Sequence, residues 1–332
     1  MKSYIKRYKD FFTEQHNRLL HIERKENEII KMLNDYVAMD EKKREKEWIK
    51  IPDHDVSMDE NRRAEDLPAI YRKREKHFLG QNVYADYYEL KRAYLVKKMI
   101  NGTKIRLGRA NDGGYICVDE VIVRGGVAYS FGISDDVSWD LDVANKYGCD
   151  VYQYDHTIGR LPQTCDKFHF HRLGISANDE AEQKTMSLPS LLKANGHMNA
   201  DRMILKMDVE GAEWEVLENL PQDILKRFGL LVMEMHDFHM EHKIKKYTEI
   251  VKKLNLTHQL VHLHANNCGD SWYCGDIVFT HAVEVTYVRK DLFEFEDALF
   301  LAPQSLDQPC NPHLEEAVLG NFGREAKEHV RV

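Results

Sequence analysis

Apolar residues follow two different patterns along the chain, which changes character near residue 100. Residues 3–48 contain no Gly or Pro and are rich in residues that favour helix. Apolar or aromatic side chains occupy eight of ten positions in two heptad series, one starting at Ile5 and the other at Tyr8. The pattern predicts a long helix that packs on its own domain, self-associates as a short coiled coil, or lies on an anionic membrane surface.

Residues 51–102 connect this predicted helical arm to the rest of the chain. Pro52 ends the helix, and residues 51–68 are polar, as in a linker. Residues 69–100 again have a helical and aromatic pattern. We expect these accessory helices to pack on the domain that follows.

From residue 103 short apolar runs alternate with helical segments. A hairpin is predicted around the turn at 111–114, and helices are predicted near 137–147, 211–219 and 241–254. This alternation is typical of a mostly parallel sheet covered on both faces. We therefore expect an arm over 1–50, a linker with accessory helices over 51–102, an α/β domain over 103–290 and a C-terminal extension over 291–332.

The charge is distributed unevenly between these regions. The net charge of −8 disfavours nucleic acid as the main partner, and it divides into +4 over residues 1–100 and −12 over 101–332. No apolar run is long enough for a transmembrane segment, and the N-terminus lacks the apolar core of a signal peptide. The six cysteines show no CxxC spacing, so we expect a cytoplasmic protein with reduced cysteines.

Acidic or imidazole side chains follow five of the predicted strands. In chain order they are Asp135 and Asp136, then Asp155, Asp208, Glu234 with His236, and finally His264. Ligands of parallel sheets bind outside the carboxyl ends of the strands. The pattern therefore predicts one shared site at that edge.

The first two of these strand ends indicate the kind of ligand. Asp155 ends the second core strand, where an acid accepts hydrogen bonds from ribose hydroxyls. The loop after the first core strand has a single glycine, Gly132, and its neighbours Asp135 and Asp136 would repel a pyrophosphate. This disfavours a nicotinamide dinucleotide and favours a ribose-containing ligand with a cationic tail, such as S-adenosylmethionine.

Four motifs resemble the FkbM-type S-adenosylmethionine-dependent methyltransferases. The segment ILKMDVEGAE at 204–213 resembles the family signature LKxDVEGxE, and segments 106–115, 130–136 and 151–157 resemble the methyltransferase-like protein 24 branch. The resemblance covers about 103–288. It implies a class I, Rossmann-like methyltransferase fold whose seven-stranded, mostly parallel sheet has an antiparallel last strand at 277–288.

The resemblance also implies roles for individual residues around S-adenosylmethionine. Gly132, Ser134 and Asp135 would lie near its methionine part, and Asp155 would hold the ribose. Ser176, Ala177 and Asn178 would lie near the adenine, and Asp208 beside the transferred methyl group. Arg106, Arg109 and Asp112 are expected to close over the cofactor.

Methyl transfer to a hydroxyl requires removal of a proton, for which the sequence offers two arrangements. His236 or His264 would be the base, oriented by Asp208 or Glu234; His262 is a further candidate. Alternatively Asp208, Glu234 and His264 would bind Mg²⁺ or Mn²⁺, and the set could be completed by Asp237, Asn266 and Asn267. Glu213, in the first turn of a predicted helix, is explained by the helix dipole.

The resemblance implies an O-methyltransferase acting on a hydroxyl of a sugar, sugar nucleotide or glycan, as in polysaccharide biosynthesis. A methyltransferase of a protein or small natural product remains an alternative. A catalytically silent scaffold that forms a homo-oligomer through the N-terminal helix is another.

Overall fold

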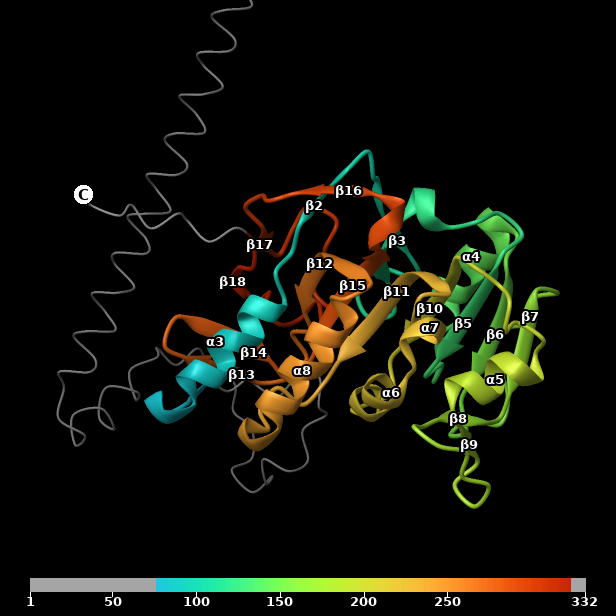
Figure 1. Ribbon diagram of the computed structural model, residues 1–332, viewed down its shortest axis with the longest axis horizontal. Coiled ribbons are helices and arrows are strands. Elements are labelled where there is room, and N and C mark those ends of the chain that lie inside the picture. The colour runs from blue at the N-terminus through green and yellow to red at the C-terminus, as the bar shows by residue number, and fades with distance from the viewer. Residues whose placement is uncertain (1–75, 324–332) are drawn as a thin grey trace, which may run out of the picture. The chain divides into compact units, whose positions relative to one another are not determined.

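The computed structural model describes residues 76–323, and their centre is a seven-stranded sheet (Figure 1). Its strands, in spatial order, are β12 (His258–Ala265), β15 (Val283–Arg289), β11 (Phe228–Met235), β10 (Met203–Met207), β5 (Val127–Phe131), β6 (Asp150–Tyr154) and β7 (Phe168–His171). The predicted arm over 1–50, the linker over 51–68 and the start of the 69–100 segment lie outside the described residues. The seven-stranded sheet is confirmed.

The strand directions place five carboxyl ends at one edge of this sheet. Strands β7, β6, β5, β10 and β11 are parallel to their neighbours. Strand β15 runs antiparallel to both β11 and β12. All residues of β10, β11 and β12 are buried, which is the pattern of strands covered on both faces.

The antiparallel strand is shorter than the predicted segment 277–288. Residues Ile277–Thr280 form β14, which pairs with β13 (Ser271–Cys274) in a separate three-stranded sheet with β1 (Lys76–Phe78). The chain changes sheet at His281 and Ala282, where the His281 N–H donates to the Asp270 carbonyl at 3.0 Å. Because apolar residues lie on both sides of this break, the sequence pattern predicted one continuous strand where the structure has two.

The two faces of the main sheet are covered differently. One face packs against α3 (Tyr84–Ala93), α5 (Leu188–Ala194), α6 (Glu213–Asn219), α7 (Gln222–Leu225) and α8 (Ile244–Leu254). Figure 1 shows α3 and α8 side by side on this face. The other face is covered by α4 (Ser138–Tyr147) and the predicted hairpin, which is formed by β3 (Lys104–Leu107) and β4 (Tyr115–Val118).

The predicted helices correspond to α4, α6 and α8, the last preceded by the 3-10 turn η5 (Glu241–Lys243). Of the segment predicted as helical over 69–100, the described part contains η3 (Gln81–Val83) and α3, with β1 before them and β2 (Lys98–Ile100) after them. Tyr87, Leu90 and Tyr94 are buried in the core, so this segment packs on the sheet domain as expected. The remaining short elements are η4 (Asp119–Val121), β8 (Gly174–Ile175), β9 (Thr185–Met186) and η6 (Lys290–Leu292). In residues 76–323 no helix is both long and apolar enough to cross a membrane.

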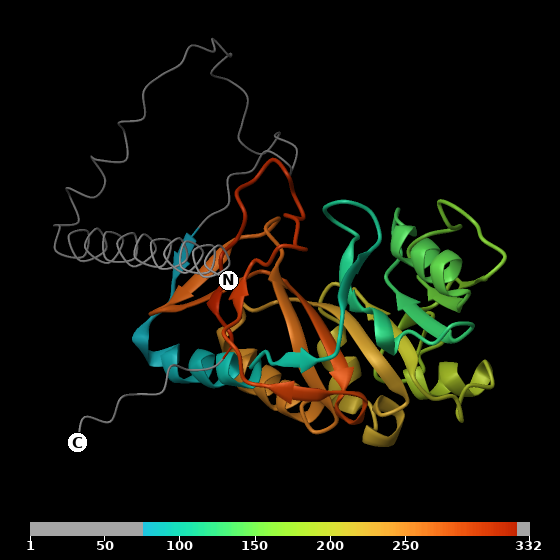
Figure 2. The same ribbon diagram turned by 90° about the horizontal axis from the view of Figure 1, so that it is seen from above.

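The segment that follows β15 returns to the sheet. Strand β16 (Glu294–Glu296) pairs with β2, as Figure 2 shows, and β17 (Leu301–Ala302) pairs with β18 (Gly320–Asn321). Phe300, Leu319 and Phe322 belong to the same core as the helices. The described part of the predicted C-terminal extension therefore packs on the α/β domain.

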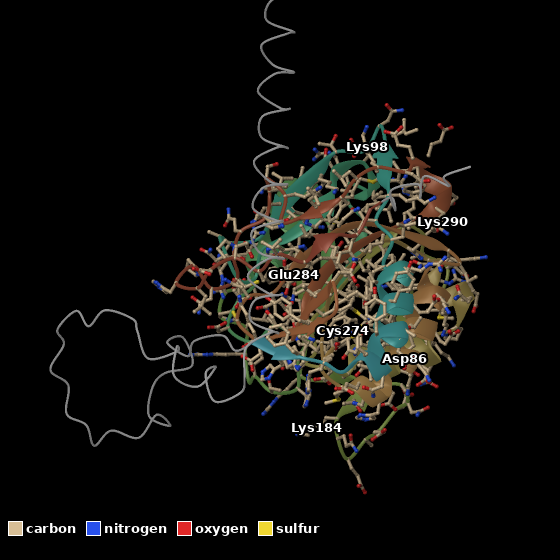
Figure 3. All side chains as sticks on the ribbon, turned by 90° about the vertical axis from the view of Figure 1, so that its left-hand side faces the viewer. Asp86, Lys98, Lys184, Cys274, Glu284 and Lys290 are labelled. Carbon is tan, nitrogen blue, oxygen red and sulfur yellow. The ribbon has the colours of Figure 1, made fainter. Side chains whose placement is uncertain are left out.

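Buried contacts between histidines and carboxyl groups attach this segment to strands β12 and β15. His264 is fully buried; its Nδ1 lies 2.9 Å from Glu284 Oε2 and its Nε2 lies 3.4 Å from Glu316 Oε1. His262 Nε2 lies 2.7 Å from Asp307 Oδ1. Figure 3 shows Glu284 among the packed side chains of the interior. Burial alone would lower the pKa of His264, but the nearby carboxylates of Glu284 and Glu316 raise it to about 10.

The variant His264→Gln is expected to lose about 3–5 kcal/mol of unfolding free energy, because it leaves two carboxylates without their cation. Since the pKa of His264 is about 10 when folded and 6.5 ordinarily, its stabilisation is complete below pH 6.5 and is lost as the pH rises through 10. Urea unfolding should therefore show that the gap between wild type and variant narrows over this range. The control is His313→Gln, which changes an exposed histidine of the same segment. A gap independent of pH would contradict the ion pair.

Candidate functional site

A cavity of about 600 Å³ lies at the carboxyl edge of β5, β6, β10 and β11. Most of the residues predicted for the site line it: Asp112, Gly132, Ser134, Asp135, Asp155, Asp208, Glu234 and His236. Arg109, Lys206 and His281 also lie in its wall. The structure thus brings to one cavity four of the five strand ends for which a shared site was predicted.

Gly132 marks the point where two of these strand ends approach each other most closely. Its φ is 75°, and a Cβ added there would lie 1.6 Å from the backbone oxygen of Asp208. The Asp208 N–H donates to the Phe131 carbonyl at 3.1 Å. Only glycine fits this position, so the single glycine of the loop is required by the packing of β5 against the end of β10.

Asp155 is almost fully buried and accepts four hydrogen bonds. Its Oδ2 accepts from the N–H groups of Ile133 and Ser134, each at 2.9 Å. Its Oδ1 accepts from the Thr157 N–H at 2.7 Å and from the Thr157 hydroxyl at 2.6 Å. Burial opposes ionisation, but these bonds keep the pKa of Asp155 below its ordinary value. Its predicted ribose contact would have to replace the hydroxyl of Thr157.

The loop between β3 and β4 closes another side of the cavity. Arg109 and Asp112 line it, and Arg109 Nε donates to the Asp112 carbonyl at 2.7 Å. Arg106, which we expected beside them, instead donates from NH2 to the Asn111 carbonyl at 2.5 Å and does not line the cavity. Two of the three predicted residues of this loop therefore reach the site.

The residues expected near an adenine are displaced from the cavity wall. Ser176, Ala177 and Asn178 do not line it, and the Ser176 hydroxyl donates to the Asn178 carbonyl at 2.5 Å. The wall there is formed by Gly174 and Ile175 of β8. The residues that line the cavity here therefore directly precede the three that we predicted.

Asp208, Glu234 and His236 converge at the floor of the cavity. One ligand atom from each lies within 4.8 Å of the others. His236 Nε2 is 3.9 Å from Asp208 Oδ1 and 3.7 Å from Glu234 Oε1. These separations exceed hydrogen-bond length, so the three side chains point at a common space.

Each of these side chains also contacts one further group. The Tyr115 hydroxyl donates to Asp208 Oδ2 at 2.9 Å, and Asn266 Nδ2 donates to Glu234 Oε1 at 2.6 Å. His236 Nδ1 lies 3.1 Å from Glu213 Oε1.

Glu213 corrects two of our expectations. It is fully buried and also accepts hydrogen bonds from the N–H groups of His236, at 2.7 Å, and Gly211, at 2.9 Å. It orients His236, a role that we had expected of Asp208 or Glu234. Its position in the first turn of α6 is therefore explained by this contact in addition to the helix dipole.

Negative charge exceeds positive charge around His236. Its ring nitrogens lie within 4.0 Å of carboxylate oxygens from Asp208, Glu210, Glu213 and Glu234. Burial and the charge of Asp208 raise the pKa of Glu234 well above its ordinary value. Burial would lower the pKa of His236, but Glu213 and Glu234 raise it to about 9. Such a cluster favours binding of a cation.

His264 does not join this cluster, contrary to both roles predicted for it. In the sheet Glu234 pairs with Glu284, and Glu284 pairs with His264, so the whole of β15 separates His264 from Glu234. The proposed metal set of Asp208, Glu234 and His264 is therefore not brought together, and His236 takes the third place. Asn267 is also elsewhere, since its side chain bonds the backbone of Asn311.

Comparison with known domain families shows to which family the chain belongs. The family model of the methyltransferase FkbM domain matches residues 93–270, which is more than half of the chain. The chain belongs to the FkbM methyltransferase domain family. The expected domain was 103–290, so the matched region begins before it and ends before its last residues.

Two relatives agree with the branch predicted within the FkbM family. The chain is 38% identical over 120 residues to "Probable methyltransferase-like protein 24" of Homo sapiens, covering 32% of each protein. The protein of the same name from Rattus norvegicus is 39% identical over 120 residues, again covering 32% of each. The chain thus matches about a third of the length of these relatives.

The FkbM match contains the cluster and the groups that hold it in place. Tyr115 and Glu213 went unrecognised as site residues, because a lone tyrosine in a strand and a glutamate in a helix are ordinary in those positions. Lys206 precedes Asp208 by two residues in the LKxD part of the FkbM signature. It lies in the cavity wall, where its Nζ donates to the Gly132 carbonyl at 3.0 Å.

The variant Gly132→Ala should be destabilised by about 3–5 kcal/mol, since it combines a left-handed backbone with a collision against Asp208. Gly125→Ala is the matched control, because Gly125 also has a positive φ, of 67°, but nothing within 4 Å of its added Cβ. That control should cost about 1–2 kcal/mol. Urea unfolding measures both, and equal losses would show that the close approach to Asp208 is unimportant.

Proposed function

We propose that the protein is an S-adenosylmethionine-dependent O-methyltransferase that binds a divalent cation through Asp208, Glu234 and His236. Family membership supports methyl transfer, for which S-adenosylmethionine is the donor. The observation that carries the cation is the convergence of the three side chains, each of which is contacted by one further group, Tyr115, Asn266 or Glu213. Groups of this kind orient the ligands of metal sites.

The cavity fits the charge of S-adenosylmethionine. The sulfonium and amino groups of S-adenosylmethionine carry positive charge, and six aspartates line the cavity: Asp112, Asp135, Asp136, Asp140, Asp155 and Asp208. The cationic side chains of the described lining are Arg109, Lys206 and His236, whose pKa is raised to about 9, and Lys206 is bonded to the Gly132 carbonyl. Attraction of opposite charges favours the proposed cofactor over a dinucleotide.

The cluster fits a hard or borderline divalent cation. Two carboxylates and one imidazole suit Mn²⁺ or Mg²⁺. When bound, such a cation lowers the pKa of an acceptor hydroxyl, which supplies the deprotonation that O-methylation requires. Glu213 holds Nδ1 of His236, which leaves Nε2 directed at the space shared with Asp208 and Glu234.

The positions of the residues also explain how donor and acceptor would be aligned. Asp208 follows β10 and meets Gly132, whose loop is proposed to hold the methionine part of the cofactor. Glu234 and His236 follow the adjacent strand β11. A methyl group beside Asp208 and a hydroxyl beside Glu234 would therefore meet at the junction of β10 and β11, where in-line displacement needs them.

The acceptor that we propose is a hydroxyl of a sugar, sugar nucleotide or glycan. The FkbM resemblance supports this class, and the polar wall of the cavity is compatible with it. Arg109, whose side chain is 44% exposed, would be available to an anionic group such as a sugar-nucleotide phosphate.

Transfer of radiolabelled methyl groups from S-adenosylmethionine to a panel of sugar nucleotides tests the proposal. Activity should disappear with EDTA and return with Mn²⁺, and Asp208→Asn and Glu234→Gln should each reduce it by at least about 100-fold. Glu213→Gln should raise the Mn²⁺ concentration that gives half-maximal activity by about 10–100-fold. The control Asp150→Asn lies at the far end of β6 and should be fully active. Turnover insensitive to EDTA would instead favour His236 as a metal-free base.

Calorimetric titration with S-adenosylhomocysteine tests the cofactor site separately. Asp155→Ala should weaken binding by about 1–3 kcal/mol, because polar partners of the carboxylate are left unpaired. Asp150→Ala, at the opposite end of the same strand, should bind like wild type. Unchanged affinity of Asp155→Ala would remove this residue from the cofactor site.

A further inference from the structure

A second group of metal-ligating side chains lies beside the site. Asp237 and His239 follow strand β11, and His281 lies between β14 and β15. One ligand atom from each lies within 4.8 Å of the others, and all three residues are half-buried. Two imidazoles and one carboxylate thus converge outside the Asp208 cluster.

These side chains have no other evident task within residues 76–323. None of the three makes a side-chain hydrogen bond with another described residue, and neither histidine lies within 4.0 Å of the Asp237 carboxylate. His239 Nδ1 is buried without a hydrogen-bond partner. Buried polar atoms are usually paired, so this nitrogen can accept a further partner.

The surrounding structure fixes the positions of all three groups. The His239 and His281 rings stack with centroids 5.3 Å apart, and His239 also lies 5.2 Å from the Trp272 ring. Asp237 approaches Gly211, where an added Cβ would lie 2.9 Å from Asp237 Oδ2. The ligands therefore come from well-packed positions rather than from free side chains.

We propose that Asp237, His239 and His281 bind a divalent cation of the borderline class, such as Zn²⁺ or Co²⁺. Sites with two imidazoles and one carboxylate suit these ions and leave coordination positions open. Adjacent ligands around such an ion are roughly 3.3 Å apart, which is within the 4.8 Å limit that these three groups meet.

This site borders the cavity but is distinct from the Asp208 cluster. His281 lines the cavity, and its ring lies 6.0 Å from that of His236. The Asp237 set has two imidazoles and one carboxylate, whereas the Asp208 cluster has one imidazole and two carboxylates. The Asp237 set is therefore the softer set of ligands. The inference stands independently of the proposed methyl transfer.

Metal binding by the full chain tests the site without any acceptor. The protein is stripped with EDTA, dialysed and titrated with Zn²⁺ in a calorimeter. His239→Ala and His281→Ala should each bind one equivalent fewer than wild type. Asp208→Asn, which alters the other cluster, should keep the equivalent that these two variants lose. His313→Ala, an exposed histidine away from both clusters, should match wild type.

The outcome decides the assignment even where a histidine variant fails to fold. Asp237→Asn keeps the shape of the side chain, and circular dichroism establishes that each variant is folded. A folded Asp237→Asn protein should bind the same equivalent at least tenfold more weakly. Zn²⁺ stoichiometry and affinity unchanged in the folded variants would overturn the proposal, whether or not the methyltransferase activity is found.

Discussion

The closest backbone approach at the site is the contact between Gly132 and Asp208, and the rest of the cavity is arranged around it. A side chain at residue 132 would occupy the position of the Asp208 carbonyl oxygen. Because these residues end neighbouring parallel strands, the contact fixes the first-strand loop relative to the acid of the next strand. The loop after Gly132 forms the cavity wall together with Asp155. Next to Asp208, the end of the adjacent strand β11 contributes Glu234 and His236.

Hydrogen-bond donors compensate the negative charge of two buried carboxylates at the site. Asp155 is compensated by three N–H groups and a hydroxyl, and Glu213 by two N–H groups and the ring of His236. Asp208 and Glu234 each receive one hydrogen bond, from Tyr115 and Asn266. Since one bond leaves most of the lone pairs of a carboxyl group available, these two side chains retain acceptor capacity where the methyl donor and the cation are proposed to bind.

Local patterns predicted the sheet and the edge that carries the site, because alternating apolar runs and strand-end acids are short-range features. They did not predict which histidine joins Asp208 and Glu234. His236 and His264 both stand near strand ends after apolar runs, and only the insertion of β15 between β11 and β12 separates them. Strand order is a long-range property. The same limit applies to Tyr115, whose partner Asp208 is 93 residues away, and to the break at His281 inside an apolar stretch.

The attachment of residues 308–310 has a consequence for the order in which the domain is built. The loop that carries Asp112 is held by the side chain of Gln308 and the carbonyls of Pro309 and Cys310. These contacts span almost 200 residues. During synthesis the chain emerges from its N-terminus, so the sheet, whose last strand β15 ends at Arg289, is available before this wall is secured. The cavity is thus among the last parts of the domain to be completed, and a nascent chain with a formed sheet would still lack a closed binding site.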